Sequence, residues 1–304
     1  MTAILGAPDA AAKRKRFAEG LKSGKLLRFP GAFSPHIAQI IEQIGFDGVY
    51  ISGAGIANDL GYPDIGITTL TEVATRGRQI ARATSLPALI DIDTGFGEAM
   101  SVARTVGELE ELGLAGCHLE DQINPKRCGH LDNKGIVSVQ DMVTKVRAAA
   151  NAKKDKNFVI MARTDAAASE GLEAAIERAK AYVDAGADAI FPEAMRDEKD
   201  FAAFRKAIKV PLLANMTEFG KSRLFTTKEL TDLGYNMVIY PMTSFRLAMG
   251  AVEAGYREIF SAGTQEGVVD RMQTRKRLYE IISYEDYNAF DQSIFNFSQK
   301  NHGG

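Results

Sequence analysis

The stretch that decides the fold is FVIMARTDAAASEGLEAAIERAKAYVDAGADAIFPEA, residues 158–194. It opens with a short apolar strand pattern at 158–165 and returns to a second one at 189–194. Between them, apolar positions recur every three or four residues and the pattern closes on Gly186, as in an amphipathic helix. A strand, a helix and a strand in this order indicate parallel strands joined by a crossover helix.

The same alternation continues along the chain. We expect eight strands, at residues 26–33, 48–53, 87–95, 116–121, 158–165, 189–194, 211–216 and 237–242. Eight such strands favour an α/β fold, a closed (β/α)₈ barrel of the TIM type, for which 304 residues is an ordinary length. An open, doubly wound sheet is the alternative. We expect one barrel domain over residues 1–304, with residues 250–304 as a C-terminal helical region.

Composition narrows the classes of function. The net charge is −2, with 45% hydrophobic and 25% charged residues, so no basic surplus points to nucleic acid or an anionic membrane. No apolar run reaches transmembrane length and the first residues lack a signal-peptide pattern, so we expect a cytoplasmic protein. The two cysteines lie in different surroundings and predict no disulfide framework. The basic run KRKR at 13–16 is expected to be a solvated helix face.

Polar residues gather where the expected strands end, and in such barrels the working groups lie at the carboxyl ends of strands. Asp91 and Asp93 are two residues apart, so on a strand both carboxylates face one side and repel each other without a cation. Hard oxygen donors of this kind suit Mg²⁺. Two turn aspartates before glycines are the alternative, and Glu120 at the end of the next strand favours the metal.

A cysteine occupies a cationic loop in NPKRCGHLDNKG, residues 124–135. Lys126, Arg127 and His130 surround Cys128 and would lower the pKa of its thiol, which raises reactivity. An accidental surface thiol is the alternative for this stretch taken alone.

Other motifs are weaker. Residues 53–55 suggest a dinucleotide fingerprint, but Asn58 stands where the third glycine belongs, so we reject it. A structural role is the better interpretation for three scattered histidines, His36, His118 and His302. Three arginines are candidates for binding carboxylates: Arg163, the strongest because it follows an apolar strand directly, Arg246 and Arg275.

Taken together, these motifs resemble a known family. The motifs that carry the resemblance are, in chain order, YISG, DIDTGFG, HLEDQ, KRCGH, ARTDA, FPEA, ANMTEFG and MQTR. They cover nearly the whole chain and resemble the 2-methylisocitrate lyases of the isocitrate lyase and phosphoenolpyruvate mutase superfamily. The resemblance implies a Mg²⁺-dependent barrel enzyme, with Mn²⁺ as an alternative metal, that cleaves a 2-hydroxy tricarboxylate to pyruvate and succinate in propionate catabolism, the methylcitrate cycle. It also implies a homotetramer that exchanges C-terminal helices.

The resemblance also implies roles for individual residues. Tyr50 matches the base on the substrate hydroxyl and Cys128 the catalytic acid on a closing loop. Asp91 and Asp93 match the metal site, with Asp64 and Glu120 around its waters. The positions matching substrate contacts are Ser52, Gly53, Ala54, Gly129, His130, Arg163, Glu193, Asn215, Met216, Thr217, Arg246 and Arg275. Ala54 departs from the family, where glycine is common, and its methyl group narrows the substrate loop.

Rival functions remain open at this point. Superfamily lyases acting on isocitrate, 2,3-dimethylmalate or oxaloacetate are the nearest, and a non-catalytic binding barrel is the alternative from another class. Such a binding protein would be expected to have lost Cys128 or the paired aspartates, and both are present. A preference for the methylated substrate would need an apolar pocket, for which Phe191 and Ile239 are the candidates.

Overall fold

The computed structural model describes residues 6, 8–127 and 135–296 of the chain. Contacts within the chain divide it into two compact units, residues 8–249 and residues 250–304 together with 1–7.

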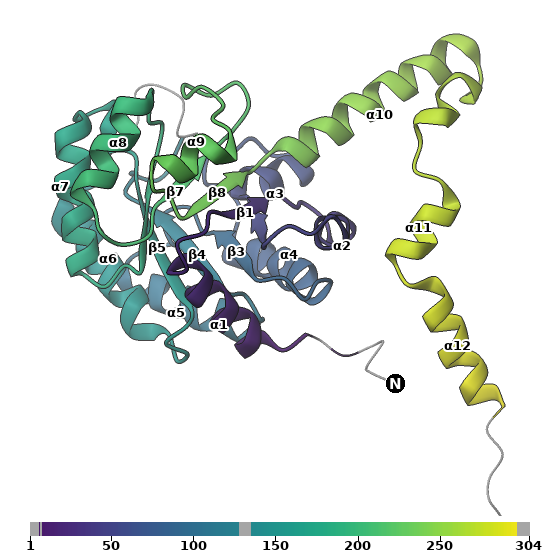
Figure 1. Cartoon of the computed structure of the whole chain (residues 1–304), viewed down its shortest axis with the longest axis horizontal. Helices are drawn as coiled ribbons and strands as arrows, with labels where there is room; N and C mark the ends of the chain where they lie inside the picture. The colour runs from purple at the N-terminus through teal and green to yellow at the C-terminus, as the bar shows by residue number, and fades with distance from the viewer. Residues whose placement is uncertain (1–5, 7, 128–134, 297–304) are drawn as a thin grey trace, which may run out of the picture. The chain divides into compact units, whose positions relative to one another are not determined.

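Parallel strands form the centre of the unit 8–249 (Figure 1). They are β1 Leu27–Pro30, β2 Val49–Ile51, β3 Ala88–Asp91, β4 Gly116–Glu120, β5 Val159–Thr164, β6 Ala189–Pro192, β7 Leu213–Asn215 and β8 Met237–Tyr240. Strands β2 to β6 form one sheet in chain order, and β1, β8 and β7 form another. Single bridges, Gly31 with Tyr50 and Ile190 with Leu212, join the two sheets into a ring. The predicted (β/α)₈ barrel is confirmed, and the open sheet is wrong.

Helices surround these strands (Figure 1). In the barrel unit they are α1 Ala10–Leu21, α2 Pro35–Ile44, α3 Gly53–Asp59, α4 Leu70–Arg82, α5 Ala99–Glu111, α6 Val139–Ala152, η1 Ala166–Ala168, α7 Leu172–Asp184, α8 Glu198–Ala207 and α9 Thr227–Asp232. The local sequence determines where these helices begin and end. Thr69 and Glu72 form a reciprocal capping box at the start of α4, and Gly186 adopts φ 108° just after α7, as its sequence predicts.

Two apolar clusters stabilise the barrel. The larger lies between the strands and the surrounding helices, and the smaller fills the barrel interior, where Phe29, Leu89 and Met161 meet Phe17 of α1. The ring of Phe17 lies 5.0 Å from that of Phe29 and approaches Gly116, the first residue of β4. Helix α1 therefore closes the end of the barrel where the strands begin, which leaves the opposite end for the site.

The basic run at 13–16 is only in part the solvated face that its sequence predicts, because Lys15 and Arg16 are exposed whereas Lys13 and Arg14 pack inward. Lys13 is 4% exposed, and its Nζ donates to the carbonyl oxygens of Ala81 at 2.6 Å and Thr84 at 3.2 Å, near the end of α4. Arg14 pairs with Asp155 at 2.6 Å. Because α1 packs against the barrel, one side of the run is buried, and this burial lowers the pKa of Lys13 to about 8.

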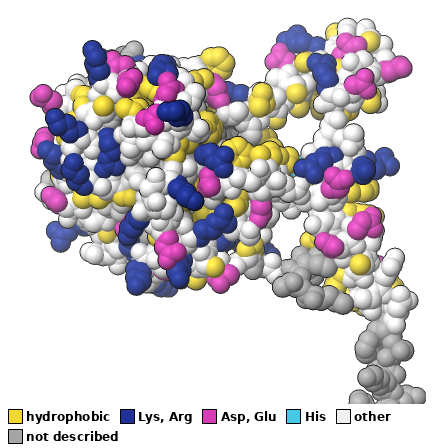
Figure 2. Space-filling model, viewed as in Figure 1, with side chains coloured by type: hydrophobic (Ala, Val, Ile, Leu, Met, Phe, Trp, Pro, Cys, Tyr) yellow, Lys and Arg dark blue, Asp and Glu magenta, His cyan; other side chains and the backbone are white. Residues whose placement is uncertain are grey.

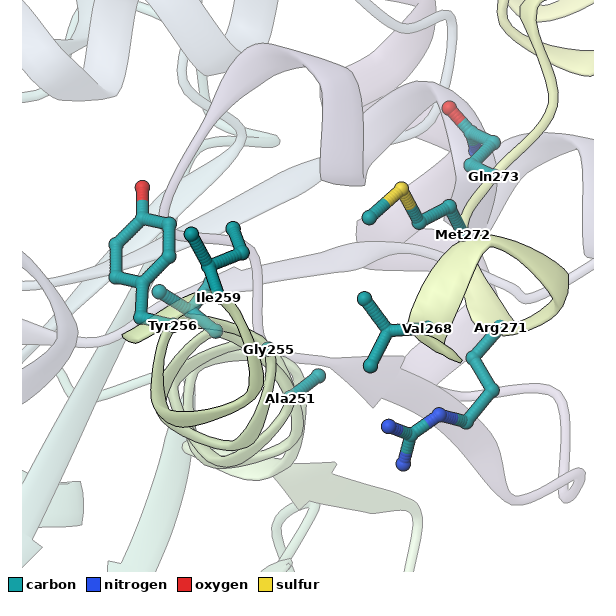
Figure 3. A pocket seen from close by; sticks show the side chains of 9 residues that line it. Ala251, Gly255, Tyr256, Ile259, Val268, Arg271, Met272 and Gln273 are labelled. Atoms are coloured by element: carbon teal, nitrogen blue, oxygen red, sulfur yellow. The ribbon is translucent and has the colours of Figure 1, made fainter. Parts of the chain in front are cut away.

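The second unit is helical. It takes in most of α10 Thr243–Ala262, followed by η2 Glu266–Arg271, α11 Arg275–Ile281 and α12 Tyr284–Phe295. A groove of about 330 Å³ separates α10 from η2, with Ile259 on one side and Val268 and Met272 on the other (Figure 3). On the face drawn in Figure 2, basic and acidic side chains are interspersed rather than gathered by sign. None of the helices described is both long and apolar enough to cross a membrane.

Candidate active site

A cavity of about 190 Å³ lies where the barrel strands end. It is lined by Tyr50, Ser52, Ala54, Asn58, Asp64, Asp91, Lys126, Arg163, Phe191, Glu193, Asn215, Thr217, Pro241, Met242 and Arg246. Most of these residues are the last of a barrel strand or follow it within a few positions, so the site is built by several strands at once.

The two predicted metal carboxylates lie at the end of β3. Asp91 is its last residue, whereas Asp93 lies in the following turn with φ 49°, so the pair does not share one strand face as the sequence predicts. The turn still holds them together, because the Asp93 amide donates to Asp91 Oδ1 at 3.0 Å. Gly53 at the start of α3 donates its amide to Asp91 Oδ2 at 3.1 Å, and a Cβ there would lie 3.0 Å from that oxygen. Glycine therefore allows this approach.

The ammonium group of Lys126 lies among the carboxylates of the site. Its Nζ contacts Asp64 and lies 2.9 Å from Asp93 Oδ1, with the side chain 4% exposed. Burial opposes the charge, but the carboxylates of Asp93, Glu120 and Asp64 outweigh it and raise the pKa of Lys126 well above its ordinary value. The sequence interpretation made Lys126 a neighbour of Cys128. The structure instead shows it as the cation of the acidic cluster.

The same cluster fits a divalent metal. Both carboxylate oxygens of Glu120 are buried and receive no hydrogen bond from the described residues, with the Arg163 guanidinium 3.3 Å away. Asp93 Oδ1 is also buried, and the Lys126 ammonium lies 2.9 Å from it. Burial raises the pKa of Asp93 to about 6 and raises that of Glu120 well above its ordinary value. Buried oxygens that lack donors are suited to a hard cation such as Mg²⁺. No three His, Cys, Asp or Glu side chains in the described residues converge as a complete ligand set, and Mg²⁺ typically takes only one or two carboxylates and keeps its waters.

Arg163 is bound by acids on three sides. Its guanidinium donates to both oxygens of Asp165, at 2.9 and 3.0 Å, and lies 3.3 Å from Glu120 and 3.2 Å from Glu193. Burial opposes the charge, but these carboxylates raise the pKa of Arg163 well above its ordinary value. The guanidinium therefore fixes the positions of protein carboxylates around the cavity as well as lining it.

The far side of the cavity is polar and more open. Asn215, at the end of β7, holds its amide nitrogen 3.3 and 3.4 Å from the Glu193 carboxylate oxygens. Arg246 donates to Thr217 Oγ1 at 3.4 Å and to the Glu218 carboxylate at 2.6 Å. A substrate carboxylate here would meet a guanidinium and an amide.

Tyr50 pairs with a histidine that sequence reasoning assigned a structural role. The Tyr50 hydroxyl lies 2.7 Å from His118 Nε2, and the two rings stack with centroids 5.7 Å apart. His118 and Glu120 alternate along β4 and so share a face, which is the signal that could have placed His118 at the site. Burial lowers the pKa of His118 to about 4 and raises that of Tyr50 well above its usual value.

The remaining predicted residues are distributed as follows. Ser52 and Ala54 line the cavity. Met216 is buried in the core, where its sulfur accepts a hydrogen bond from the Phe225 amide. Arg275 begins α11 in the second unit. Three predicted residues lie outside the described part of the chain: Cys128, Gly129 and His130.

Comparisons with known proteins agree with this architecture. A family model described as phosphoenolpyruvate phosphomutase matches residues 17–260. The chain is 61% identical over 290 residues to "Probable 2-methylisocitrate lyase 1" of Corynebacterium glutamicum, covering 95% of each chain, and six further 2-methylisocitrate lyases are 46–48% identical.

Solved structures extend the comparison. Oxaloacetate acetylhydrolase bound to 3,3-difluorooxalacetate aligns with a TM-score of 0.89 at 34% identity, over 97% of this chain and 100% of that one. Phosphonopyruvate hydrolase with oxalate and Mg²⁺ aligns with a TM-score of 0.85 at 30% identity, over 93% and 99%.

Proposed function

This chain belongs to the phosphoenolpyruvate phosphomutase family, within the superfamily that also holds the isocitrate lyases, and on that premise we propose that it cleaves 2-methylisocitrate to pyruvate and succinate. One observation carries the choice of substrate. Identity to 2-methylisocitrate lyases is 46–61% over nearly the whole chain, whereas identity to oxaloacetate acetylhydrolase is 34%. The enzyme is therefore a carbon–carbon lyase of small carboxylates.

A divalent metal is part of the proposal. Asp91 and Asp93 would hold it, and Asp64 and Glu120 would bind its water ligands. Mg²⁺ is the proposed ion, with Mn²⁺ as an alternative, and when bound it makes the substrate hydroxyl easier to deprotonate. The buried carboxylate oxygens of Asp93 and Glu120, of which those of Glu120 receive no hydrogen bond from the described residues, support this assignment. Lys126 contacts two of the same carboxylates, so its ammonium and the metal compete for them.

The proton movements follow from the bond that breaks. Tyr50, as its phenolate, takes the proton of the hydroxyl on C2, whose oxygen becomes the carbonyl of pyruvate as the bond from C2 to C3 breaks. The electron pair remains on C3 of the succinate fragment, which is stable only as a dianionic aci-carboxylate. Arg163 and Arg246, both lining the cavity, are the cations placed to stabilise this charge. The thiol of Cys128 then gives its proton to C3, which completes succinate.

Several residues would hold the substrate. Ser52, Gly53 and Ala54 are proposed to receive one carboxylate, and the polar side of the cavity another. Their positions support this role, since Ser52, Glu193, Asn215, Thr217 and Arg246 all line one cavity. Gly129, His130, Met216 and Arg275 remain proposed substrate contacts.

Substrate preference is proposed to depend on a methyl group. Phe191 lines the cavity, with its ring 5.2 Å from that of His118, so it offers an apolar wall. Ile239 lies in the cluster that fills the barrel interior, together with Phe191. An apolar contact with one methyl group is worth about 1–3 kcal/mol, or roughly 10- to 200-fold in kcat/KM.

The C-terminal helices are proposed to serve assembly. Residues 1–304 would form one lyase domain whose helical region, 250–304, is exchanged between subunits of a cytoplasmic homotetramer. Support comes from large apolar side chains left exposed in this region, among them Tyr256, Phe260 and Phe295. Light scattering at micromolar concentration tests the tetramer, and a monomer would contradict it.

Pyruvate release tests the function. Purified enzyme is assayed with Mg²⁺ against 2-methylisocitrate, isocitrate, 2,3-dimethylmalate and oxaloacetate. We expect the highest kcat/KM for 2-methylisocitrate and weak cleavage of isocitrate. A higher kcat/KM for another acid would contradict the substrate assignment while leaving the lyase chemistry intact. Absence of turnover on every acid, with binding retained, would favour a non-catalytic barrel.

A further inference from the structure

One buried histidine contacts the proposed base. His118 is fully buried, with Nε2 2.7 Å from the Tyr50 hydroxyl oxygen and 3.7 Å from Asp91 Oδ1, and its Nδ1 finds no hydrogen-bond partner among the described residues. We propose that His118 carries its proton on Nε2 and donates it to the Tyr50 oxygen, which makes His118 the positioning residue of that base. This inference rests on the proposed function, in which Tyr50 removes the hydroxyl proton.

The two neutral tautomers are not equivalent here. With the proton on Nδ1, a buried N–H would lack an acceptor, which costs about 1–3 kcal/mol. The bare Nε2 would then face the Asp91 carboxylate, acceptor against acceptor. With the proton on Nε2, the N–H faces the oxygens of Tyr50 and Asp91. The atom left without a partner is then Nδ1, an acceptor, and proteins tolerate a buried acceptor without a partner better than a buried donor without one. The environment therefore selects the Nε2–H form.

The surrounding groups keep the imidazole neutral and fixed. The imidazole is fully buried, which disfavours its charged form, and its charged neighbours, Asp91, Arg163, Glu193 and Lys126, are of both signs. The Tyr50 ring stacks on one side at an interplanar angle of 11°. Phe191 packs against His118 at 69°, which limits rotation of the imidazole.

The direction of this hydrogen bond matters for the base. If the imidazole donates, the Tyr50 oxygen is an acceptor in that bond, and its own O–H is free to point into the cavity that Tyr50 lines. Burial raises the pKa of Tyr50, with Asp91 adding to the effect, and both disfavour a phenolate. A fixed N–H donor stabilises the charged oxygen more than the neutral one and so counters this.

Three substitutions of His118 distinguish hydrogen-bond donation to Tyr50 from packing against it. In His118→Gln an amide N–H can reach the position of Nε2, in His118→Asn it reaches only that of Nδ1, and His118→Phe keeps a ring without a donor. We expect His118→Gln to retain kcat within about tenfold. The Asn and Phe variants should lose roughly 10- to 150-fold in kcat, the worth of a hydrogen bond to a charged group, with little change in KM. Their pH profile for kcat should show the base titrating at higher pH than in the Gln variant.

Two outcomes would overturn the proposal. One is equal activity and equal pH profiles for the Gln and Asn variants. The other comes from ¹⁵N NMR of histidine-labelled wild-type enzyme, in which the His118 resonances are assigned by their loss in His118→Gln. We expect the shift pattern of an Nε2–H tautomer, and an Nδ1–H pattern would refute it. Because the NMR measurement needs no substrate, it still decides the tautomer if the proposed lyase activity proves wrong.

Discussion

Replacing Arg163 by methionine should destabilise the barrel strongly before any effect on catalysis is measured. The guanidinium lies within 3.3 Å of three buried carboxylates, those of Asp165, Glu193 and Glu120. Removing one partner of a buried ion pair costs about 3–5 kcal/mol, because the remaining charge stays desolvated. For a domain of this size that corresponds to a fall in Tm of roughly 6–20 °C.

The loss of stability in Arg163→Met should depend on pH in a defined direction. Without the cation, the pKa values of the three carboxyls rise in the folded state above their unfolded values near 4. The folded state then binds more protons than the unfolded state in that window, so the free energy of unfolding falls as pH rises through it. Arg163→Met should therefore be closer to wild type at pH 5 than at pH 8.

Circular dichroism melts at the two pH values test this, with Arg246→Met as the matched control. Arg246 also lines the cavity and pairs with Glu218 at 2.6 Å, but its side chain is 37% exposed. A pair of that kind is worth about 0–1 kcal/mol, so the control should melt close to wild type. A loss below about 1 kcal/mol for Arg163→Met, or one that is the same at both pH values, would refute the reasoning.

Three further predictions concern the site. EDTA should abolish pyruvate release and Mg²⁺ restore it, while Asp91→Ala stays inactive at ordinary Mg²⁺; full activity of metal-free enzyme would remove the metal. Cys128→Ser should fold and bind pyruvate and succinate but lose nearly all turnover, and substantial activity would remove the thiol from the mechanism. Gly53→Ala should weaken Mg²⁺ binding in calorimetry because its Cβ would lie 3.0 Å from Asp91 Oδ2. The control Gly107→Ala, in open space within α5, should instead stabilise by about 0.5–1 kcal/mol, and equal effects would contradict the steric argument.

Much of the barrel could be predicted because the sequence patterns that indicate its strands are local. Each strand is a short apolar run, and the polar residue that ends it, such as Asp91, Arg163 or Glu193, follows directly in the sequence. In a parallel barrel these ends meet at one face, so adjacency in space follows from topology. That is why most candidate residues in the described part of the chain line one cavity.

What could not be predicted depends on long side chains and on turn conformation. The sequence predicts a solvated charge for Lys13 and a neighbour of Cys128 for Lys126, yet each extends into a buried polar position that only the folded chain creates. Asp93 departs from the strand pattern because its φ of 49° belongs to a turn. The pairing of His118 with Tyr50 could not be predicted because Tyr50 lies 68 residues earlier, although the alternation of His118 with Glu120 along β4 indicates that both face the site.

The two sheets of the barrel meet at two places, and each sheet carries part of the site. Asp91 ends β3 and Glu193 directly follows β6 in the five-stranded sheet, whereas Asn215 ends β7 in the three-stranded one, and single bridges join the sheets. A small shear between β6 and β7, where the two sheets meet, would change the distance between Asp91 and Asn215 without breaking the ladder within either sheet. Directed evolution toward longer or shorter acids is therefore best aimed at residues flanking Ile190 and Leu212.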